Sequence, residues 1–363
     1  MAKGGQGHAG RDDQHADLAP VLLRLLAARI GAGRVRPDRL MRGMGFGPDD
    51  LAAPDFNVSY RQCVEVLRRY AAVAELSLEE ALRLGGRLGV VSLGHVGLGM
   101  MASADIHDMF RLLAEFHRSA GFPLAVEEAW VDGEFGMVVQ PRHGDTDVEP
   151  FLVAYTLAAL QSLTRQVLGT DFRPRSVSLA LARPADASVF DRVFGCRVKF
   201  DAGLHRLGVG PALPVHSADA CVALRMREVL EQASPRQALT DHGAAVAQVI
   251  RRHTAAVPTF AQIAGALNMT ERTLRRKLFE EGLTYRGLLA EERRLRTLAL
   301  VRGTRASMQD VAEQTGYGSP RSLRRAVQRW TGQGPRAERK AAAHRPAGRP
   351  PAEDVPEPPP PWP

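Results

Sequence analysis

Two segments near the carboxyl end of the chain repeat one pattern: a short helix, a tight turn and a second helix. In the first segment, apolar residues over 260–267 recur at helical spacing until 268–269 interrupt them. Thr270 is then a favourable N-cap for the second helix, in which Leu274 and Leu278 fall on one side. This spacing predicts two packed helices that share a small apolar core.

The second segment follows the same plan with its own capping residues. Ser307 caps a short helix, residues 316–318 form the turn, and Ser319 caps the next helix. Pro320 occupies the first helical position, where its missing N–H costs nothing, and Trp330 closes the predicted core. The N-caps of the two second helices lie 49 residues apart. The repetition predicts an all-helical domain built from two helix-turn-helix units.

The outward sides of both second helices are rich in arginine and other polar side chains. These are Arg272, Thr273, Arg275 and Arg276 in the first segment and Arg321, Ser322, Arg324, Arg325 and Gln328 in the second. A short helix, a turn and a second helix with guanidinium groups on its free face form the geometry that enters the major groove of DNA. We therefore expect these residues to contact DNA, some of them through phosphates. Those expected to face base edges are Arg272, Arg276, Arg321 and Arg325.

A single helix over 285–301 is expected to connect the two units. Its apolar stripe includes Leu288, Leu295 and Ala299 and is interrupted by Glu292. Two second helices joined by a rigid helix can enter successive major grooves, which lie roughly 34 Å apart on one face of DNA.

Positive charge is concentrated in this part of the chain. Residues 246–340 contain 19 Lys and Arg against 8 Asp and Glu, a net charge of +11, whereas the 363-residue chain has 48 against 40 and a net charge of +8. The remainder of the chain is therefore slightly acidic. Such segregation indicates a polyanion partner, and the arginine-bearing helices specify double-stranded DNA.

The residues from 18 to 215 predict a separate mixed α/β domain. The Asp132-Gly133 pair between two alternating segments indicates a hairpin, because this pair tolerates the positive φ of a tight turn. Ser77 and Glu80 have the spacing of a capping box. Helices are expected at 18–30, 59–76, 77–88, 105–119, 151–168 and around Phe190, and strands at 124–130, 135–140, 176–182, 196–200 and 204–209. The fold class is thus mixed: an amino-terminal α/β domain and a carboxyl-terminal all-α domain over 240–338.

Five apolar side chains on the hairpin and its covering helix are candidates for the wall of an effector pocket. They are Phe122, Trp130, Phe135, Met137 and Tyr155. Such residues more often form plain core, so both interpretations stay open at this point.

The remaining segments predict tails and a linker. Residues 1–17 are polar and Gly-rich, 216–239 connect the two domains, and 339–363 are Pro-rich, so both ends are expected to be disordered. No apolar leader or membrane span is evident. The three cysteines form no C-x-x-C pair and the histidines share no ligand spacing. We expect a cytoplasmic protein without disulfides, metal or cofactor.

The residues from 258 to 339 resemble a known family. The stretch VAEQTGYGSPRSLRRAVQRWTGQGP at 311–335 is similar to the AraC-type DNA-binding domain, whose usual run is A-x-x-x-G-F-x-x-x-x-x-F-x-R-A-F-K-R-W-T-G-x-x-P. Leu323 and Val327 stand where phenylalanine is usual, and Gln328 where lysine is common. The positions that match are Ala312, Gly316, Arg325, Ala326, Arg329, Trp330, Thr331, Gly332 and Pro335.

The amino-terminal half resembles a second domain of the same kind of protein. LARPADASVFDRVFGCRVKF at 181–200, followed by Leu213 and Pro214, is similar to the arabinose-binding-type domain of regulators related to the ornithine-utilisation activator. This resemblance implies that the domain senses a small molecule and promotes dimerisation. It also implies a homodimeric, sequence-specific transcription activator that acts on RNA polymerase, rather than an enzyme.

Two other interpretations were weighed from the residues. An enzyme with a DNA-targeting domain, such as a repair protein that accepts an alkyl group on cysteine, needs an activated thiolate. Cys63, Cys196 and Cys221 have only Arg61 and Arg197 as basic neighbours in the sequence. A chromosome-coating protein would share the positive charge but would bind all DNA sequences alike.

Overall fold

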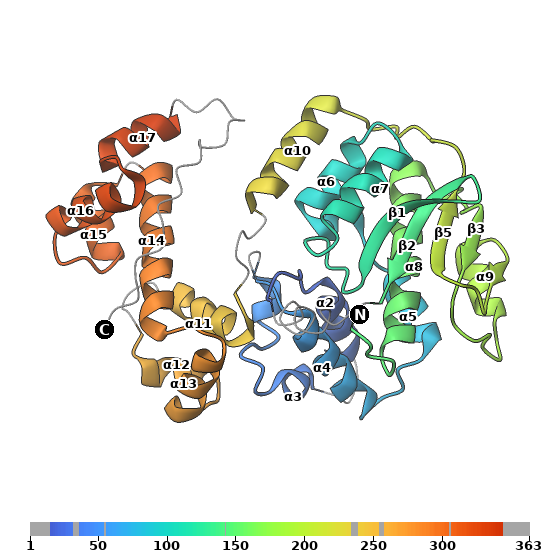
Figure 1. Ribbon diagram of the computed structural model, residues 1–363, viewed down its shortest axis with the longest axis horizontal. Coiled ribbons are helices and arrows are strands. Elements are labelled where there is room, and N and C mark those ends of the chain that lie inside the picture. Colours follow the sequence, from blue (N-terminus) through green and yellow to red (C-terminus); the bar gives the residue numbers. More distant parts are fainter. Residues whose placement is uncertain are drawn as a thin grey trace, which may run out of the picture. The chain divides into compact units, whose positions relative to one another are not determined.

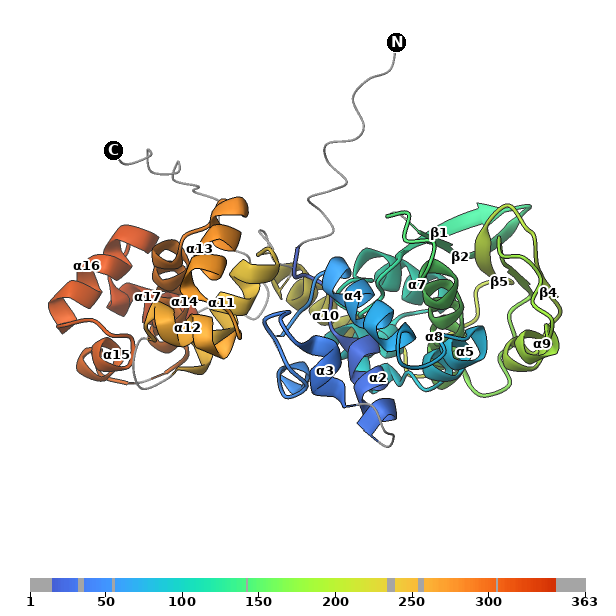
Figure 2. The same ribbon diagram turned by 90° about the horizontal axis from the view of Figure 1, so that it is seen from below.

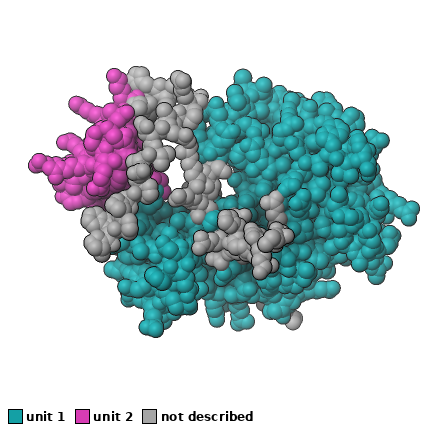
Figure 3. Space-filling model, in the orientation of Figure 1, with its two compact units in different colours: residues 1–292 teal, residues 293–363 magenta. Residues whose placement is uncertain are grey.

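The computed structural model describes residues 15–31, 36–53, 56–141, 143–233, 239–253, 258–304 and 306–343. The chain divides into two compact units, residues 1–292 and residues 293–363 (Figure 3). This division falls within one long helix, α14 (Tyr285–Gly303).

Unit 1 contains a five-stranded sheet of order β1-β2-β5-β3-β4. The strands are β1 (Ala125–Val131), β2 (Glu134–Gln140), β3 (Ser176–Ser178), β4 (Val198–Lys199) and β5 (His205–Val209). All neighbours are antiparallel except β3 and β4, which are parallel. The predicted hairpin is confirmed: β1 and β2 pair with Trp130 opposite Phe135, and Asp132 and Gly133 have φ of 52° and 76°. Positive φ at both turn residues matches the right-handed twist of the strands.

Helices surround this sheet and extend beyond it (Figure 1). Helix α8 packs on β2 and β5, and α5 runs alongside α8 in both views (Figures 1 and 2). The helices of the unit are α2 (Val21–Gly31), α3 (Pro37–Met41), α4 (Tyr60–Ala71), α5 (Leu78–Gly86), α6 (His95–Ala102), α7 (Ile106–Glu115), α8 (Glu149–Leu168), α9 (Ser188–Phe194), α10 (Ala220–Ala233), α11 (Asp241–Arg252), α12 (Phe260–Ala266) and α13 (Glu271–Glu280), with short 3-10 turns η1 (Asp50–Ala52) and η2 (Val90–Leu93). No helix in the described ranges is both long enough and apolar enough to cross a bilayer.

Unit 2 is helical throughout its described residues. The end of α14 packs with α15 (Met308–Gln314), α16 (Pro320–Thr331) and α17 (Pro335–Ala343). Its small core is made of Leu298, Val301, Val311, Ala312, Leu323 and Val327. The mixed fold class predicted from the sequence is thus confirmed.

Two local expectations differ from the structure. The strand expected at 176–182 ends at Ser178, because the backbone N–H of Ala180 donates to the His205 ring instead of to a neighbouring strand. The capping box at Ser77 is half formed, since the carboxylate of Glu80 binds Arg29 and Arg83 rather than the backbone.

The connecting helix α14 also buries different residues from those expected. Leu295 is 47% exposed and Ala299 is exposed, whereas Leu298 and Val301 are buried in unit 2. Glu292 is buried in unit 1 because its carboxylate receives two hydrogen bonds from Arg251, at 2.9 and 3.0 Å. The two ends of α14 therefore pack into two separate cores, and the buried side chains do not form one continuous stripe along the helix.

Parts of the predicted linker and tail are helical. Helix α10 lies within the expected linker 216–239 and packs on α6. Helix α17 continues to Ala343, five residues into the segment expected to be disordered. Glu338 in α17 accepts a hydrogen bond from Arg302 at 2.8 Å, and this pair holds α17 against α14. The rest of the tail and residues 1–14 lie outside the described residues.

The close approach of α5 and α8 generates a stability prediction. A Cβ at Gly85 would lie 2.3 Å from the carbonyl oxygen of Tyr155 and 2.9 Å from the Cβ of Ala158, so the Gly85→Ala variant must push the two helices apart. We expect the free energy of unfolding, measured by urea titration with far-UV circular dichroism, to fall by about 1–3 kcal/mol.

Gly86→Ala is the matched control, because nothing lies within 4 Å of a Cβ at that position. This neighbouring substitution should leave the stability unchanged or raise it by up to about 1 kcal/mol. Equal stabilities for the two variants would contradict the packing described here.

Candidate nucleic-acid interface

Helices α12 and α13 form the first predicted helix-turn-helix unit. Thr259 and Gln262 make a reciprocal capping box at the start of α12, and Asn268 in the turn has φ of 53°. The Thr270 hydroxyl accepts from the Thr273 backbone N–H at 3.2 Å and so caps α13. The leucines of α13, Leu274 and Leu278, face the core, where Leu274 is fully buried. The sequence signals therefore place one fixed side of α13 inward.

The opposite side of α13 exposes its arginines to solvent. The guanidinium of Arg275 lies 5.1 Å from the ring centroid of Phe260, and Arg276 binds Glu280 one turn later. Arg272 has no recorded ion pair within the ranges that the structure describes. Thr273 is only half exposed, and its hydroxyl lies 2.8 Å from that of Thr270, so it supports the cap.

Helices α15 and α16 form the second unit with the same local chemistry. Ser307 and Asp310 make a reciprocal capping box on α15, and Gly316 in the turn has φ of 72°. Ser319 accepts from the Ser322 backbone N–H at 3.2 Å, and Gly332 ends α16 with φ of 68°. The Ser319 hydroxyl thus satisfies one of the free N–H groups at the start of α16, and the Gly332 N–H donates to the Gln328 carbonyl at its end.

The arginines of α16 are the most available cations at this candidate interface. Arg321, Arg324 and Arg325 are all exposed, and no ion pair is recorded for them among the described residues. Ser322 and Gln328 are also exposed but are engaged locally: the Ser322 hydroxyl donates to the Ser319 carbonyl at 2.7 Å, and the Gln328 amide donates to the Gly332 carbonyl at 2.7 Å.

One exposed residue on α13 was missed by the sequence analysis. Phe279 is 82% exposed, although phenylalanine normally packs into a core. At 100° per residue it falls between Arg272 and Arg275 on the outward side of α13. The same 49-residue offset that relates Arg272 to Arg321 relates Phe279 to Gln328. Comparing each outward residue of the second segment with the residue 49 positions earlier would have identified Phe279 as an outward residue.

Glu281, just after α13, ties this helix to the start of α11. Its carboxylate accepts from the backbone N–H groups of His242 at 3.1 Å and Gly243 at 3.0 Å, and from the side chains of Thr240 and His242. Burial alone would raise the pKa of Glu281, but the hydrogen bonds from His242 and Thr240 outweigh it and hold the pKa below its ordinary value of 4.5. The carboxylate is therefore ionised and caps α11.

The five expected effector-pocket residues gather on the hairpin and its neighbours but are mostly closed off. Phe122, Phe135, Met137 and Tyr155 are at most 3% exposed and belong to the main core, while Trp130 is 66% exposed at the edge strand β1. The structure thus assembles them as packed core with one solvent-facing member, and their role in effector binding stays a prediction.

Two of the three cysteines, Cys63 and Cys196, do not have the environment of an alkyl acceptor. Cys63 is fully buried, which raises the pKa of its thiol to about 12, and burial also raises the pKa of Cys196. A thiol that accepts an alkyl group needs the opposite shift. Within the described residues, no three His, Cys, Asp or Glu side chains gather as a metal ion would require.

Comparison with known proteins agrees with both resemblances. Residues 35–216 match the family described as the arabinose-binding domain of AraC transcription regulators, amino-terminal, and residues 263–341 match a helix-turn-helix domain. These domains are those of transcription regulators rather than enzymes.

Two relatives from Pseudomonas aeruginosa align over most of the chain. The HTH-type transcriptional regulator VqsM is 24% identical over 300 residues, covering 78% of this chain and 90% of its own. The ornithine utilization regulator is 27% identical over 342 residues, covering 90% and 97%. The crystal structure of the transcriptional regulator CdpR from the same organism shares 21% identity and covers 85% of this chain and 100% of its own, with a TM-score of 0.38.

The Glu281 cap predicts a pH-dependent stability difference. Glu281→Gln removes the charge and replaces one of two acceptor oxygens, each of which serves two donors, by an NH2 group, so hydrogen exchange of the α11 amides should report about 1.5–3 kcal/mol less protection at neutral pH. Because the folded-state pKa is lowered, the stabilisation is present above the ordinary value of 4.5 and is lost as the pH falls through the folded-state pKa. The difference from the wild-type chain should therefore shrink in that range.

Glu280→Gln provides the control for this experiment. Glu280 is exposed and, among the described residues, its ion pair is with Arg276 one turn away, so its loss should change protection by less than about 0.5 kcal/mol at any pH. A Glu281→Gln effect as small as this one would show that the cap does not stabilise α11.

Proposed function

The chain belongs to the family of AraC transcription regulators that carry an amino-terminal arabinose-binding domain, and we propose that it reads specific DNA sequences through the exposed faces of α13 and α16. One observation carries this proposal. Two capped second helices expose arginine at three corresponding positions, Arg272 with Arg321, Arg275 with Arg324, and Arg276 with Arg325. A merely solvated helix face gives no reason for the same three positions to recur behind a tight turn.

The arginines have two roles in this proposal. Arg272, Arg276, Arg321 and Arg325 face base edges, where a guanidinium makes a bidentate contact with guanine. The other polar side chains of the two faces contact phosphates and set the register on the duplex. The net charge of +11 over residues 246–340 adds a salt-dependent attraction that is independent of sequence.

In this proposal the amino-terminal domain, residues 35–216, regulates DNA binding. A small-molecule effector bound there changes the affinity or arrangement of the chain on DNA, and a homodimer acts on RNA polymerase as an activator in the cytoplasm. The matched domain and the relative that regulates ornithine utilization support control by a small metabolite. Coating of DNA without sequence preference is the competing function that the following experiment excludes.

Arg272→Ala and Arg321→Ala test the readout. Selection from random DNA should return a defined site for the wild-type chain, and each variant should lose preference at one base position, a penalty of about 1–3 kcal/mol there. Arg87→Ala removes an exposed arginine far from both helices in the sequence and should select the unchanged site. No enriched site, or an equal loss on all sequences, would contradict base readout.

Phe279 supplies a separate prediction about thymine. Its exposed ring can contact the C5-methyl group of thymine in the major groove. Replacing thymine by uracil at one position of the selected site should weaken wild-type binding about fourfold, the value of one buried methyl group. Phe279→Ala should be insensitive to that replacement and Phe279→Leu should keep part of the sensitivity. Equal sensitivity of all three proteins would place Phe279 away from the bases.

A further inference from the structure

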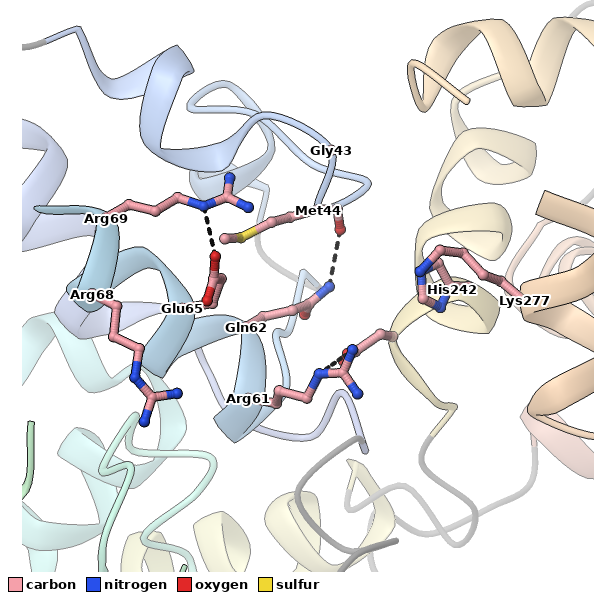
Figure 4. A pocket seen from close by; sticks show the side chains of 10 residues that line it. Gly43, Met44, Arg61, Gln62, Glu65, Arg68, Arg69, His242 and Lys277 are labelled. Carbon is pink, nitrogen blue, oxygen red and sulfur yellow. Dashed lines mark hydrogen bonds and ion pairs between the residues drawn. The ribbon is translucent and has the colours of Figure 1, made fainter. Parts of the chain in front are cut away.

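A cavity of about 370 Å3 lies within unit 1, beside the start of α11 (Figure 4). One wall is a single face of α4, which contributes Arg61, Glu65 and Arg69 at helical spacing. Figure 4 shows His242 of α11 and Lys277 of α13 across from this face. The volume falls in the range of sites for small molecules.

The cations in the wall differ in how far they are already used. Arg69 is held through two of its three nitrogens: Nε binds Glu65 at 2.8 Å, and Nη1 donates to the backbone carbonyls of Leu40 and Arg42 at 3.1 and 2.7 Å. Arg68, also in the wall, is held by Asp145 and Asp147, each at 2.7 Å. These two arginines are fixed parts of the scaffold.

Arg61 and Lys277 are not used in this way. Arg61 approaches Asp241 only to 3.9 Å, which is too long for a hydrogen bond, so its guanidinium donors remain available. For the Lys277 ammonium no hydrogen bond or ion pair is recorded in the described part of the chain, and the side chain is half-buried against the cavity. Two cations with free donors, supplied by different helices, form a ready site for an anion.

Asp241 differs from these cations because it offers a carboxylate that accepts hydrogen bonds. Its side chain is only 8% exposed, it lines the cavity, and its Oδ1 atom has no hydrogen-bond partner. Burial raises the pKa of this carboxyl group. A buried carboxylate oxygen without a donor costs free energy, and a bound molecule whose donor reached Oδ1 after a small movement of the Asp241 side chain would remove that cost.

We propose that this cavity binds a small organic carboxylate that also carries a hydroxyl or amino group. The carboxylate binds Arg61 and Lys277, and the hydroxyl or amino group donates to Asp241. This proposal rests on the proposed function in one respect, since it makes the bound molecule the effector. Lys277 lies on α13, the helix that carries Arg276 and Phe279 on its outward side, so a molecule bound to Lys277 contacts a helix that is proposed to read DNA.

Calorimetry of the purified full-length chain without DNA tests the site. The probes are succinate, L-malate and L-aspartate, which share one four-carbon dicarboxylate skeleton and differ only at the second carbon by H, OH or an ammonium group. At least one of malate and aspartate should bind saturably, one molecule per chain, and about tenfold or more tightly than succinate, because a hydrogen bond to a charged group is gained. Equal affinity for succinate, or no saturable binding of any probe, overturns the proposal.

Arg61→Gln and Lys277→Gln should each weaken binding of the tighter probe at least tenfold, because each removes one charge-assisted contact. Arg87→Gln is the control and should bind as the wild type does. Circular dichroism verifies that each variant is folded. Unchanged binding by folded Arg61→Gln and Lys277→Gln proteins would place the probe elsewhere and overturn the assignment.

The effect of the bound probe on DNA binding is measured separately. Affinity for the selected DNA site, measured with and without the tighter probe, should change severalfold in the wild-type chain and not in Arg61→Gln. Probe binding without any change in DNA affinity overturns the effector role. Failure of the proposed function is distinguishable, because it appears as absence of a selected DNA site in experiments that contain no probe.

Discussion

The outward direction of the arginines depends on burial of a few aliphatic side chains behind two capped helices. Leu274 and Leu278 in α13, and Leu323 and Val327 in α16, are at most 2% exposed. Because a helix turns by about 100° per residue, burying these pairs leaves only the opposite side for Arg272 and Arg321. The caps at Thr270 and Ser319 set where each helix starts and thereby which residues are on that side. The direction of the side chains proposed to read DNA is thus decided by apolar packing on the opposite side of each helix.

Most elements could be predicted because their signals are local. The hairpin at Asp132 and Gly133 and the caps at Thr270 and Ser319 depend on neighbours within four residues, and the structure confirms them. What could not be predicted depends on residues distant in sequence. Helix α17 is held by the Arg302–Glu338 pair, and the buried side of α14 at Glu292 is decided by Arg251. No periodicity within one segment contains that information.

The candidate functional residues also separate into those with local sequence signals and those that depend on distant parts of the chain. The arginine faces follow from spacing alone, and Phe279 was missed only because apolar residues are expected to be buried. The cavity is different, since its walls come from α4, α11 and α13, which lie far apart in the chain. Arg61 and Lys277 become partners of one ligand only when the fold brings these helices together, and Asp241 gains meaning only through its burial.

The Arg61–Asp241 contact beside the cavity is weak, and this weakness makes the cavity suitable for regulation by a ligand. Arg61 with Asp241 is a loose pair with a half-exposed guanidinium, and pairs of this kind contribute roughly 0–1 kcal/mol. Coupling between an effector and a DNA site needs only about 1–3 kcal/mol. Glu281 binds the start of α11 at the end of α13, so a ligand that contacts Asp241 and Lys277 acts on two helices already joined. A few charge-assisted contacts made by a small carboxylate therefore supply free energy of the size that such coupling needs.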